Sequence, residues 1–431
     1  MRRGRLLQAG IALLATSAVA LAAGCGSSGP GSSSGSLQVW SLQDTGLNPV
    51  VKAAITRYNK TASTKATLST YVNDPYKQKI QVALGTPKAP DVFFNWGGGN
   101  LSQFVKEGQV APLDDALAKN PKVKSAFLPA VLQVGQVDGK QYGLPMTGTQ
   151  PVILYYNKTM FAKYGLQPPK TFDDMMSLVK TFKSKKITPI SLPGKQAWTE
   201  MMYPEYFLDR IGGPDKFATI LKQGGDAWKD PAVIKSMELS QQLVKAGAFG
   251  TNYASIDYDN TGASKLFATG KAAMYVMGTW DTSTQAINNP SFTKNDMGYT
   301  AFPTVGGGTG DPSDVVGNPS NYFSVSAQSK NKDAAADFLI KTLDSDEYID
   351  ALIKAGQVPT TVGVEPKLNT GDQAAFNVFT YQLAQGSKNF IQSWDQALPP
   401  SIANEMLTDL SKVFLLQMTP QQFADDMAKT K

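Results

Sequence analysis

Residues 37–41 (LQVWS), 66–72 (ATLSTYV) and 91–95 (DVFFN) decide the fold, because each is a short β-rich run and a helical pattern separates it from the next. An amphipathic helix is predicted over residues 48–58 and a second helix over residues 76–84. This β-α-β-α-β order predicts a parallel sheet covered by helices, and therefore an α/β fold. In such sheets ligands gather beyond the carboxyl ends of the strands.

The remaining chain alternates between strands and helices and then becomes mainly helical. Further strands are predicted over residues 152–156, 271–277, 297–302 and 322–326. Further helices are predicted over residues 171–183, 199–210, 231–246, 261–269, 332–343, 345–354, 372–383, 401–414 and 420–427. The glycine-rich residues 306–310 (GGGTG) lack the lysine of a phosphate-binding loop, so they predict a surface loop.

The composition of the chain limits which kinds of catalytic or metal site it can form. The chain has 431 residues, of which 42% are hydrophobic and 18% charged, a balance that excludes disorder and collagen and favours two domains. It contains no histidine and one cysteine, which excludes histidine triads, internal disulfides and metal sites built on histidine or cysteine clusters. We therefore expect no metal and no cofactor. A glycosidase stays open, because it needs only two carboxylates.

The net charge of +6 overstates how basic the body of the chain is. Arg2, Arg3 and Arg5 lie in the first five residues, and without residues 1–24 the chain has 38 basic and 35 acidic side chains. A nearly neutral body without dense basic runs argues against a nucleic-acid partner.

The N-terminus is typical of an exported lipoprotein. Residues 1–24 combine a basic head with an apolar stretch, which predicts a signal peptide. Residues 21–25 (LAAGC) resemble a bacterial lipobox, which implies that Cys25 is lipidated and anchors the chain to the outer face of the cytoplasmic membrane. Residues 25–36 then form a flexible Gly/Ser tether. The alternative is an ordinary signal peptide with a chance cysteine.

Several short segments, in this order, resemble the extracellular solute-binding proteins of sugar ABC importers, the maltose-binding-protein-like superfamily. Apart from the lipobox, they are residues 108–113 (GQVAPL), 139–145 (GKQYGLP), 154–158 (LYYNK), 169–174 (PKTFDD), 267–274 (FATGKAAM), 278–281 (GTWD), 334–339 (AAADFL) and 356–359 (GQVP). The stretch 393–400 (SWDQALPP) is similar to members that take up xylobiose-like or other short oligosaccharides.

The resemblance implies a two-lobed periplasmic-binding-protein-like fold of type II, each lobe a mainly parallel sheet with flanking helices. It implies crossing strands near residues 147–151, 278–279 and 323–327 as the hinge. Lobe 1 would then hold residues 37–148 and 280–324, and lobe 2 residues 149–279 and 325–431. The implied protein is a monomer that binds a sugar between the lobes and delivers it to the ABC permease, without enzymatic activity.

A sugar offers hydroxyls to polar side chains and C–H faces to aromatic rings, so a sugar cleft should mix both kinds of residue. Trp280 and Asp281 follow a predicted crossing strand, although a buried indole with an N-capping aspartate is the alternative. Asn95 and Trp96 precede three glycines, and a strand-end turn is the alternative there. The other candidate ligand-binding residues are Trp40, Gln43, Asp44, Trp198, Tyr203, Trp394 and Asp395.

The sequence therefore leaves two classes of function open. The resemblance favours a carbohydrate receptor, and the alternatives are a surface-anchored carboxylate glycosidase or a receptor for another solute such as a peptide, a polyamine or a metal. The order of the segments favours the receptor, and no pair of carboxylates at strand ends has a distinctive spacing that would favour the glycosidase.

Overall fold

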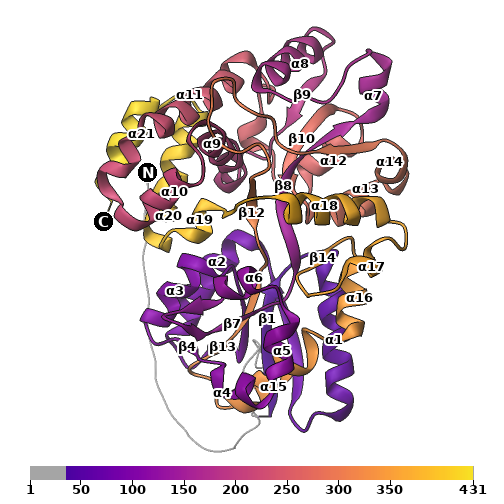
Figure 1. Ribbon diagram of the computed structural model, residues 1–431, viewed down its shortest axis with the longest axis vertical. Helices are drawn as coiled ribbons and strands as arrows, with labels where there is room; N and C mark the ends of the chain where they lie inside the picture. The colour runs from indigo at the N-terminus through magenta and orange to yellow at the C-terminus, as the bar shows by residue number, and fades with distance from the viewer. Residues whose placement is uncertain (1–34, 431) are drawn as a thin grey trace, which may run out of the picture.

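The computed structural model describes residues 35–430, which form two lobes, one above the other in Figure 1. The predicted signal peptide, Cys25 and the tether up to residue 34 lie outside the described residues. No helix in the described part of the chain is both long and apolar enough to cross a membrane.

Lobe 1 is the lower body in Figure 1 and is built on a six-stranded sheet of order β2-β1-β3-β13-β4, with β7 beside β13. Its strands are β1 (Ser36–Leu42), β2 (Lys65–Tyr71), β3 (Val92–Asn95), β4 (Val110–Ala111), β7 (Gly143–Pro145) and β13 (Tyr322–Ser326). Its helices are α1 (Leu47–Thr61), α2 (Asn73–Leu84), α3 (Gly98–Lys106), α4 (Asp114–Lys119), α5 (Pro121–Ala126), α6 (Pro129–Val134), α15 (Lys332–Thr342) and α16 (Asp346–Lys354), and β5 (Gln136–Val137) pairs with β6 (Lys140–Gln141).

Lobe 2 is the upper body and holds a seven-stranded sheet of order β15-β12-β8-β10-β9, with β11 and β14 also paired to β8. Its strands are β8 (Gly148–Asn157), β9 (Thr188–Ser191), β10 (Ala272–Gly278), β11 (Met297–Thr300), β12 (Val315–Asn318), β14 (Val358–Pro359) and β15 (Phe390–Gln392). Its helices are α7 (Lys158–Lys163), α8 (Phe172–Ser184), α9 (Ala197–Gly212), α10 (Asp215–Gln223), α11 (Pro231–Ala246), α12 (Gly262–Ala268), α13 (Asp281–Asn288), α14 (Pro290–Asn295), α18 (Ala374–Gly386), α19 (Trp394–Ala397), α20 (Pro400–Phe414) and α21 (Pro420–Met427). Short helices η1 (Gly225–Lys229), η2 (Tyr253–Ser255) and α17 (Glu365–Leu368) complete the described elements.

The β-α-β-α-β start of the chain is confirmed. Strand β1 pairs in parallel with both β2 and β3, as the separating helices require. Helix α1 buries Leu47, Val50, Val51, Ala54, Ile55 and Tyr58 against the sheet, because these residues recur at helical spacing. The carboxyl ends of β1 and β3 consequently point to one edge of lobe 1.

The expectation of mainly parallel sheets is confirmed, with one exception in each lobe. In lobe 1, β13 runs antiparallel to β3, β4 and β7, and in lobe 2 the long strand β8 runs antiparallel to β10, β11, β12 and β14. Both β8 and β13 enter a sheet from the other lobe, against the direction of the strands already there. Each sheet therefore has one antiparallel strand, β13 in lobe 1 and β8 in lobe 2, among strands that all run in one direction.

The predicted lobe boundaries need correction. Within residues 280–324, Phe292 and Val316 belong to the lobe 2 core, because β11 and β12 pair with β8. Within residues 325–431, Phe338 belongs to the lobe 1 core, because β13 inserts into that sheet and α15 follows it directly. The C-terminal helices from α18 onward lie in lobe 2.

Three segments cross between the lobes: the start of β8, the turn between β12 and β13, and the segment holding β14. The first agrees with the crossing predicted near residues 147–151. The crossing predicted at 278–279 was wrong, because β10 leads into α13 within lobe 2, where Tyr155 and Thr282 share a hydrogen bond of 2.9 Å. The crossing predicted at 323–327 lies slightly earlier, since those residues fall within or directly after β13.

Candidate ligand-binding cleft

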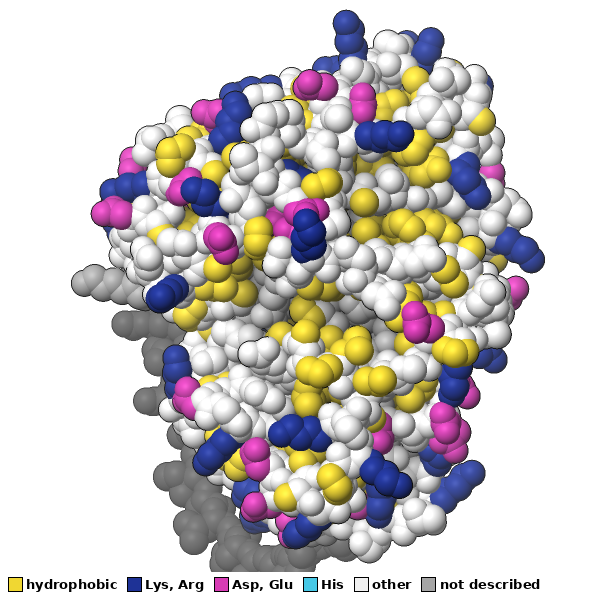
Figure 2. All heavy atoms as spheres, in the orientation of Figure 1, with side chains coloured by type: hydrophobic (Ala, Val, Ile, Leu, Met, Phe, Trp, Pro, Cys, Tyr) yellow, Lys and Arg dark blue, Asp and Glu magenta, His cyan; other side chains and the backbone are white. Residues whose placement is uncertain are grey.

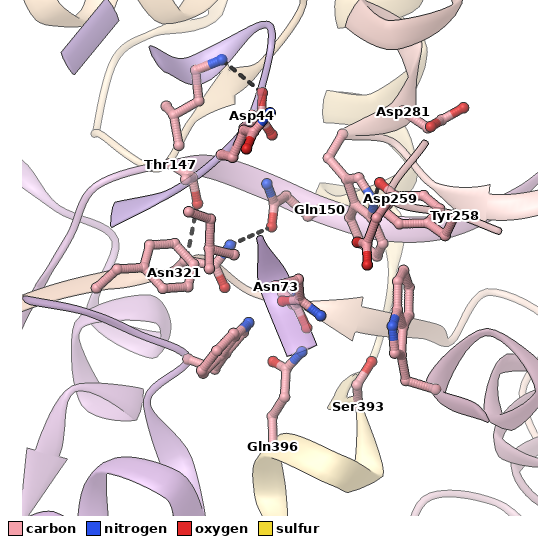
Figure 3. Close-up of a pocket in the computed structure, with 18 of the residues that line it drawn as sticks. Asp44, Asn73, Thr147, Gln150, Tyr258, Asp259, Asp281, Asn321, Ser393 and Gln396 are labelled. Atoms are coloured by element: carbon pink, nitrogen blue, oxygen red, sulfur yellow. Dashed lines mark hydrogen bonds between the residues drawn. The ribbon is translucent and has the colours of Figure 1, made fainter. Parts of the chain in front are cut away.

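A cleft lies between the lobes, enclosing about 1190 Å³ including its open mouth. Lobe 1 lines it with the loop after β1, the start of α2 and the end of β3; lobe 2 lines it with the start of α9, the loop before α12, the start of α13 and α19. The crossing segments form its floor. Figure 3 shows Asp44 on one side of this space, Ser393 and Gln396 on the opposite side, and Asn73 between them.

Aromatic rings from lobe 2 form one wall. Trp198 meets Tyr258 edge-on with ring centres 4.8 Å apart, and its ring centre lies 6.3 Å from that of Trp280. The indole N–H of Trp280 donates to the Tyr258 hydroxyl at 2.9 Å, which fixes the indole plane. A Cβ on Gly278 would lie 1.8 Å from the Trp280 ring, so only glycine leaves room for it. Such flat surfaces suit the C–H faces of sugar rings.

Trp96 faces this wall from lobe 1. Its ring packs against Phe94 at 5.1 Å and Tyr76 at 6.1 Å, both edge-on, and the ammonium of Lys77 lies 5.3 Å from its ring centre. Aromatic surface therefore comes from both lobes, and an occupant of the cleft would contact both.

The floor consists of polar side chains that bond to one another across the crossing segments. Asn321 donates its amide N–H₂ to Gln150 at 2.8 Å, and its backbone N–H donates to the Thr147 hydroxyl at 2.8 Å. Gly148 donates its backbone N–H to Gln357 at 3.0 Å, which adds the third crossing segment. The hinge is thus a single hydrogen-bonded unit at the base of the cleft.

Asp44 lies at the start of α1. Its carboxylate accepts the backbone N–H groups of Gly46 and Leu47, each at 2.8 Å, in a helix-capping arrangement. Burial raises the pKa of Asp44, and the two backbone hydrogen bonds oppose that rise.

Asp281 lies at the start of α13, almost completely buried. Its oxygens accept the Ser264 hydroxyl at 2.9 Å and the Gln285 amide at 2.7 Å. Burial is the main cause that raises the pKa of Asp281 to about 7, and the negative charge of Asp44 adds to it. The charge of Asp44 in lobe 1 therefore acts on Asp281 in lobe 2.

Several polar atoms of the residues that line the cleft have no hydrogen-bond partner. The acceptor oxygens Asn318 Oδ1, Asn321 Oδ1, Asp395 Oδ1 and Gln396 Oε1 are buried without a hydrogen bond, and so is the donor Trp198 Nε1. A buried unpaired polar atom costs about 1–3 kcal/mol, so an occupant that supplies partners would be favoured. Four acceptors and one donor call for a molecule rich in hydroxyl or N–H groups.

Acidic side chains outnumber basic ones in the lining of the cleft. Asp44, Asp259, Asp281 and Asp395 line it, and Lys77 is the one basic side chain among the lining residues. The Lys77 ammonium already pairs with Asp395 at 2.8 Å. Within residues 35–430 no group of three or more histidine, cysteine, aspartate or glutamate side chains is placed to hold a metal ion.

Seven of the predicted site residues line the cleft: Gln43, Asp44, Trp96, Trp198, Trp280, Asp281 and Asp395. Asn95 does not, because its amide donates to Ser324 at 2.8 Å and accepts the Gly97 N–H at 3.0 Å, which ties β3 to β13. Trp40 also does not, because its ring packs on Tyr71 at 4.9 Å under the ammonium of Lys79.

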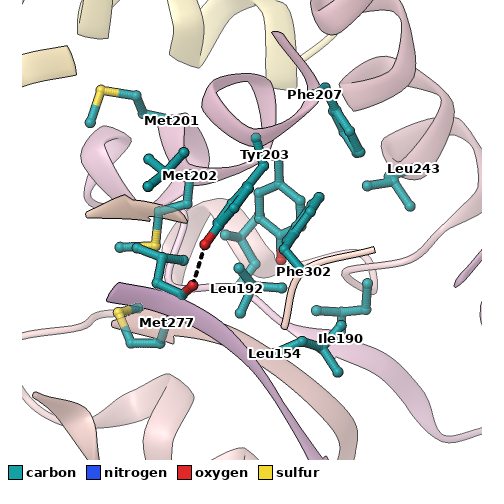
Figure 4. Close-up of a cluster of buried hydrophobic side chains, with 14 of the residues drawn as sticks. Leu154, Ile190, Leu192, Met201, Met202, Tyr203, Phe207, Leu243, Met277 and Phe302 are labelled. Carbon is teal, nitrogen blue, oxygen red and sulfur yellow. Dashed lines mark hydrogen bonds between the residues drawn. The ribbon is translucent and has the colours of Figure 1, made fainter. Parts of the chain in front are cut away.

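The other two misplaced candidates lie in the lobe 2 core. Tyr203 is fully buried among apolar side chains, as Figure 4 shows, because α9 is buried on all sides from Thr199 to Arg210. Trp394 stacks on Phe217 at 5.1 Å and meets Trp228 edge-on at 6.1 Å, so it anchors α19 rather than facing the cleft.

Sequence reasoning missed several lining residues, including Asn73, Gln150, Tyr258, Asp259 and Asn321. Asn73 directly follows the predicted strand over residues 66–72, so the strand-end rule could have found it. Gln150 and Asn321 flank two crossings, and Tyr258 and Asp259 lie in a loop whose sequence carries no periodic signal.

On the face shown in Figure 2, lysine and arginine side chains alternate with aspartate and glutamate rather than gathering into one patch. Apolar side chains are exposed across the middle of this face, between the two lobes.

Known proteins share this architecture. A structure from a study of xylan utilisation by the thermophilic bacterium Caldanaerobius polysaccharolyticus has a TM-score of 0.80 and 30% identity, over 91% of this chain and 99% of that one. A chitin oligosaccharide binding protein has a TM-score of 0.82 at 24% identity, over 91% and 97% of the two chains.

Curated relatives match in sequence. An uncharacterised ABC transporter extracellular-binding protein of Pyrococcus horikoshii is 34% identical over 220 residues, which span 50% of this chain and about half (48%) of that relative. The diacetylchitobiose binding protein DasA of Streptomyces coelicolor is 29% identical over 306 residues, 69% of this chain and 67% of DasA. The model of the bacterial extracellular solute-binding protein family matches residues 42–348, and with a two-lobed fold around an interlobe cleft the chain belongs to that family.

Proposed function

We propose that the protein is an extracytoplasmic receptor that captures a short, uncharged oligosaccharide in the interlobe cleft and delivers it to an ABC permease. One observation carries this proposal: aromatic rings on both walls of the cleft surround unpartnered acceptor atoms. Rings fit the apolar faces of a sugar, and its hydroxyls supply the missing donors.

The relatives support the same class of ligand. DasA is named for binding diacetylchitobiose, and the Caldanaerobius structure comes from work on xylan utilisation. Both names point to β-linked sugars, which makes xylobiose, cellobiose and diacetylchitobiose the first ligands to test.

The charge of the cleft supports an uncharged ligand. A uronate or a sugar phosphate would place an anion beside Asp44, Asp259 and Asp281, whose pKa values burial already raises because this site disfavours negative charge, and the ammonium of Lys77 is already paired. Like charges in a partly buried site repel strongly, so acidic sugars would be rejected.

Isothermal titration against a panel of mono- and disaccharides, followed by chromatography of the mixture, tests the proposal. We expect binding of at least one neutral oligosaccharide without release of its monosaccharides, and much weaker binding of its uronate-bearing counterpart. Release of monosaccharide would identify a glycosidase, and binding of peptides or polyamines but no sugar would contradict the sugar receptor.

We also propose that the receptor is a monomer held at the outer face of the membrane by a lipid on Cys25, within the lipobox-like sequence LAAGC. Several acyl chains make a durable anchor, at about 0.8 kcal/mol per buried CH₂. The variant Cys25→Ser should then be found in the medium or remain unprocessed. A Cys25→Ser protein that is cleaved and still as firmly bound to the membrane as wild type would contradict the anchor.

A further inference from the structure

Helix α19 carries residues of the cleft and also connects the two lobes. It is a single turn that follows β15, and Ser393, Asp395 and Gln396 around it line the cleft. Its Asp395 pairs with Lys77 of α2 at 2.8 Å across the lobes, and the side chain of this aspartate is only 4% exposed. Nearby, Gln392 donates its amide to the carbonyl of Trp96 at 2.8 Å.

The backbones also meet closely at this place. A Cβ built on Gly99 of α3 would lie 2.2 Å from the carbonyl oxygen of Ala397, and one on Gly98 would lie 2.2 Å from Gln392 Oε1. Because glycine has no side chain, the backbones of α3 and α19 come into contact here. This contact allows the Lys77 ammonium and the Asp395 carboxylate to form a close ion pair. Each of these contacts joins two residues of the protein itself, so the contacts between the lobes can form without a ligand in the cleft.

On the lobe 2 side α19 is fixed by Glu205 of α9. Oxygen Oε1 of this buried side chain accepts the backbone N–H of Trp394 at 2.5 Å, at the first residue of α19. The Trp394 indole packs into the lobe 2 core against Phe217 and Trp228. Burial holds the pKa of Glu205 well above its usual range, and the neighbouring Asp395 charge acts in the same direction. A neutral carboxyl still accepts this hydrogen bond, and it leaves Asp395 free to pair with Lys77.

We propose that α19 is an interlobe clasp: Glu205 positions the helix on lobe 2, the Lys77–Asp395 pair ties it to lobe 1, and these three residues set how often the lobes are closed. If the lobes are closed more often before binding, a larger fraction of the protein is competent to bind. The apparent dissociation constant equals the intrinsic one divided by this fraction, so the apparent affinity rises. That effect on affinity rests on the proposed function, but the clasp itself does not.

Spin labels on the two lobes test the clasp without any sugar. Residues 26–431 contain no cysteine, so Val82→Cys on α2 and Leu221→Cys on α10 can be labelled uniquely, and both side chains are exposed. Pulsed electron spin resonance then measures the distance distribution between the lobes. We expect a dominant short distance in the labelled protein and about a tenfold shift toward a longer one in Lys77→Met and in Asp395→Asn.

The double variant should open no further than either single variant, because each removes the same pair. Lys216→Met is the matched control, since it breaks the Lys216–Asp230 pair of 2.7 Å that lies within lobe 2. Distance distributions that are the same in the labelled protein, Lys77→Met and Asp395→Asn would overturn the clasp, and so would an equal opening in Lys216→Met.

A matched pair of variants tests Glu205 as a positioning residue. Glu205→Gln keeps an acceptor for the Trp394 N–H, whereas Glu205→Met has a similar length and none. We expect Glu205→Gln to retain the short distance and Glu205→Met to lose it, with circular dichroism showing that both are folded. Equal opening in both variants, or no opening in Glu205→Met, would overturn this role.

Discussion

Trp280 and Trp394 differ in their surroundings, and this difference predicts opposite effects of the same substitution. Trp280 faces the cleft, so Trp280→Ala should weaken sugar binding by about 1–3 kcal/mol, or roughly 5- to 150-fold, with little change in melting temperature. Trp394 is 1% exposed, so Trp394→Ala should lower the free energy of unfolding by about 3–5 kcal/mol. Titration and thermal unfolding of the same samples check both.

Trp228→Ala serves as the control, because Trp228 is as buried as Trp394 and does not line the cleft. It should behave as a core variant, with affinity intact in the folded fraction. If Trp280→Ala instead lowers the melting temperature by many degrees and leaves affinity unchanged, the indole belongs to the core.

Asp281 predicts a pH dependence of stability. Its pKa is about 7 in the fold and 3.8 in the unfolded chain, so between these values the native state holds a proton that the unfolded state has lost. The contribution of Asp281 to the free energy of unfolding must therefore fall as pH rises from about 4 to 7, by about 4 kcal/mol in all, and then stay level. Asp281→Asn mimics the protonated form and should match wild type near pH 4 and exceed it at pH 8. Urea unfolding at several pH values measures this, and identical pH dependence in both proteins would contradict the assignment.

Cleft residues that lie at strand ends or in local motifs could be predicted from the sequence, and Gln43, Asp44 and Trp96 are examples. It could not separate Trp280 from Trp394, because both stand in a Trp-Asp dipeptide and only packing distinguishes them. Strand periodicity does not show which face of β1 looks into the cleft, and for that reason Trp40 was misplaced.

At the scale of elements, the contact between α3 and α19 makes Gly99 a sensitive position. Gly99→Ala adds a methyl group 2.2 Å from the Ala397 carbonyl, so the two helices must separate. We expect the affinity for the identified sugar to fall roughly tenfold, about 1.4 kcal/mol, because the lobes close less readily. Gly386→Ala is the control, since its Cβ would meet open space. Calorimetric titration measures both, and equal affinities in the two variants would show that this contact does not limit closure.

Most of the longer helices were predictable, whereas the two strands that run against their neighbours were not. Helix α11 was predicted at its observed bounds, since Asp230 caps it and Gly247 ends it in the left-handed conformation. The antiparallel entry of β8 and β13 depends on where the chain changes lobe, and hydrophobic patterning carries no information about that. The lobe boundaries were misplaced for the same reason.

For the whole molecule, hydrogen bonds join the three crossing segments into one unit, and we expect this unit to act as a hinge. Bending at the hinge should leave the structure of each lobe unchanged. The hydrogen bonds of Asn321 to Gln150 and Thr147 lie at the base, while the cleft walls and the clasp lie further out. Rotation there would change the distance between the walls with little change in either core, which is the motion expected of hinge closure.

Ligand-driven compaction should therefore depend on the clasp. Saturating sugar stabilises the closed form, so the radius of gyration from small-angle X-ray scattering should decrease on binding. Lys77→Met starts from a more open population and should show a larger decrease than wild type, ending at the same compact value. It should also need more sugar to reach that value, because part of the binding energy is used to close the lobes. Lys216→Met, whose ion pair lies within lobe 2, should follow wild type. An unchanged radius of gyration in both wild type and Lys77→Met at saturation would contradict hinge closure, whereas equal decreases in the two would leave the hinge and contradict the clasp.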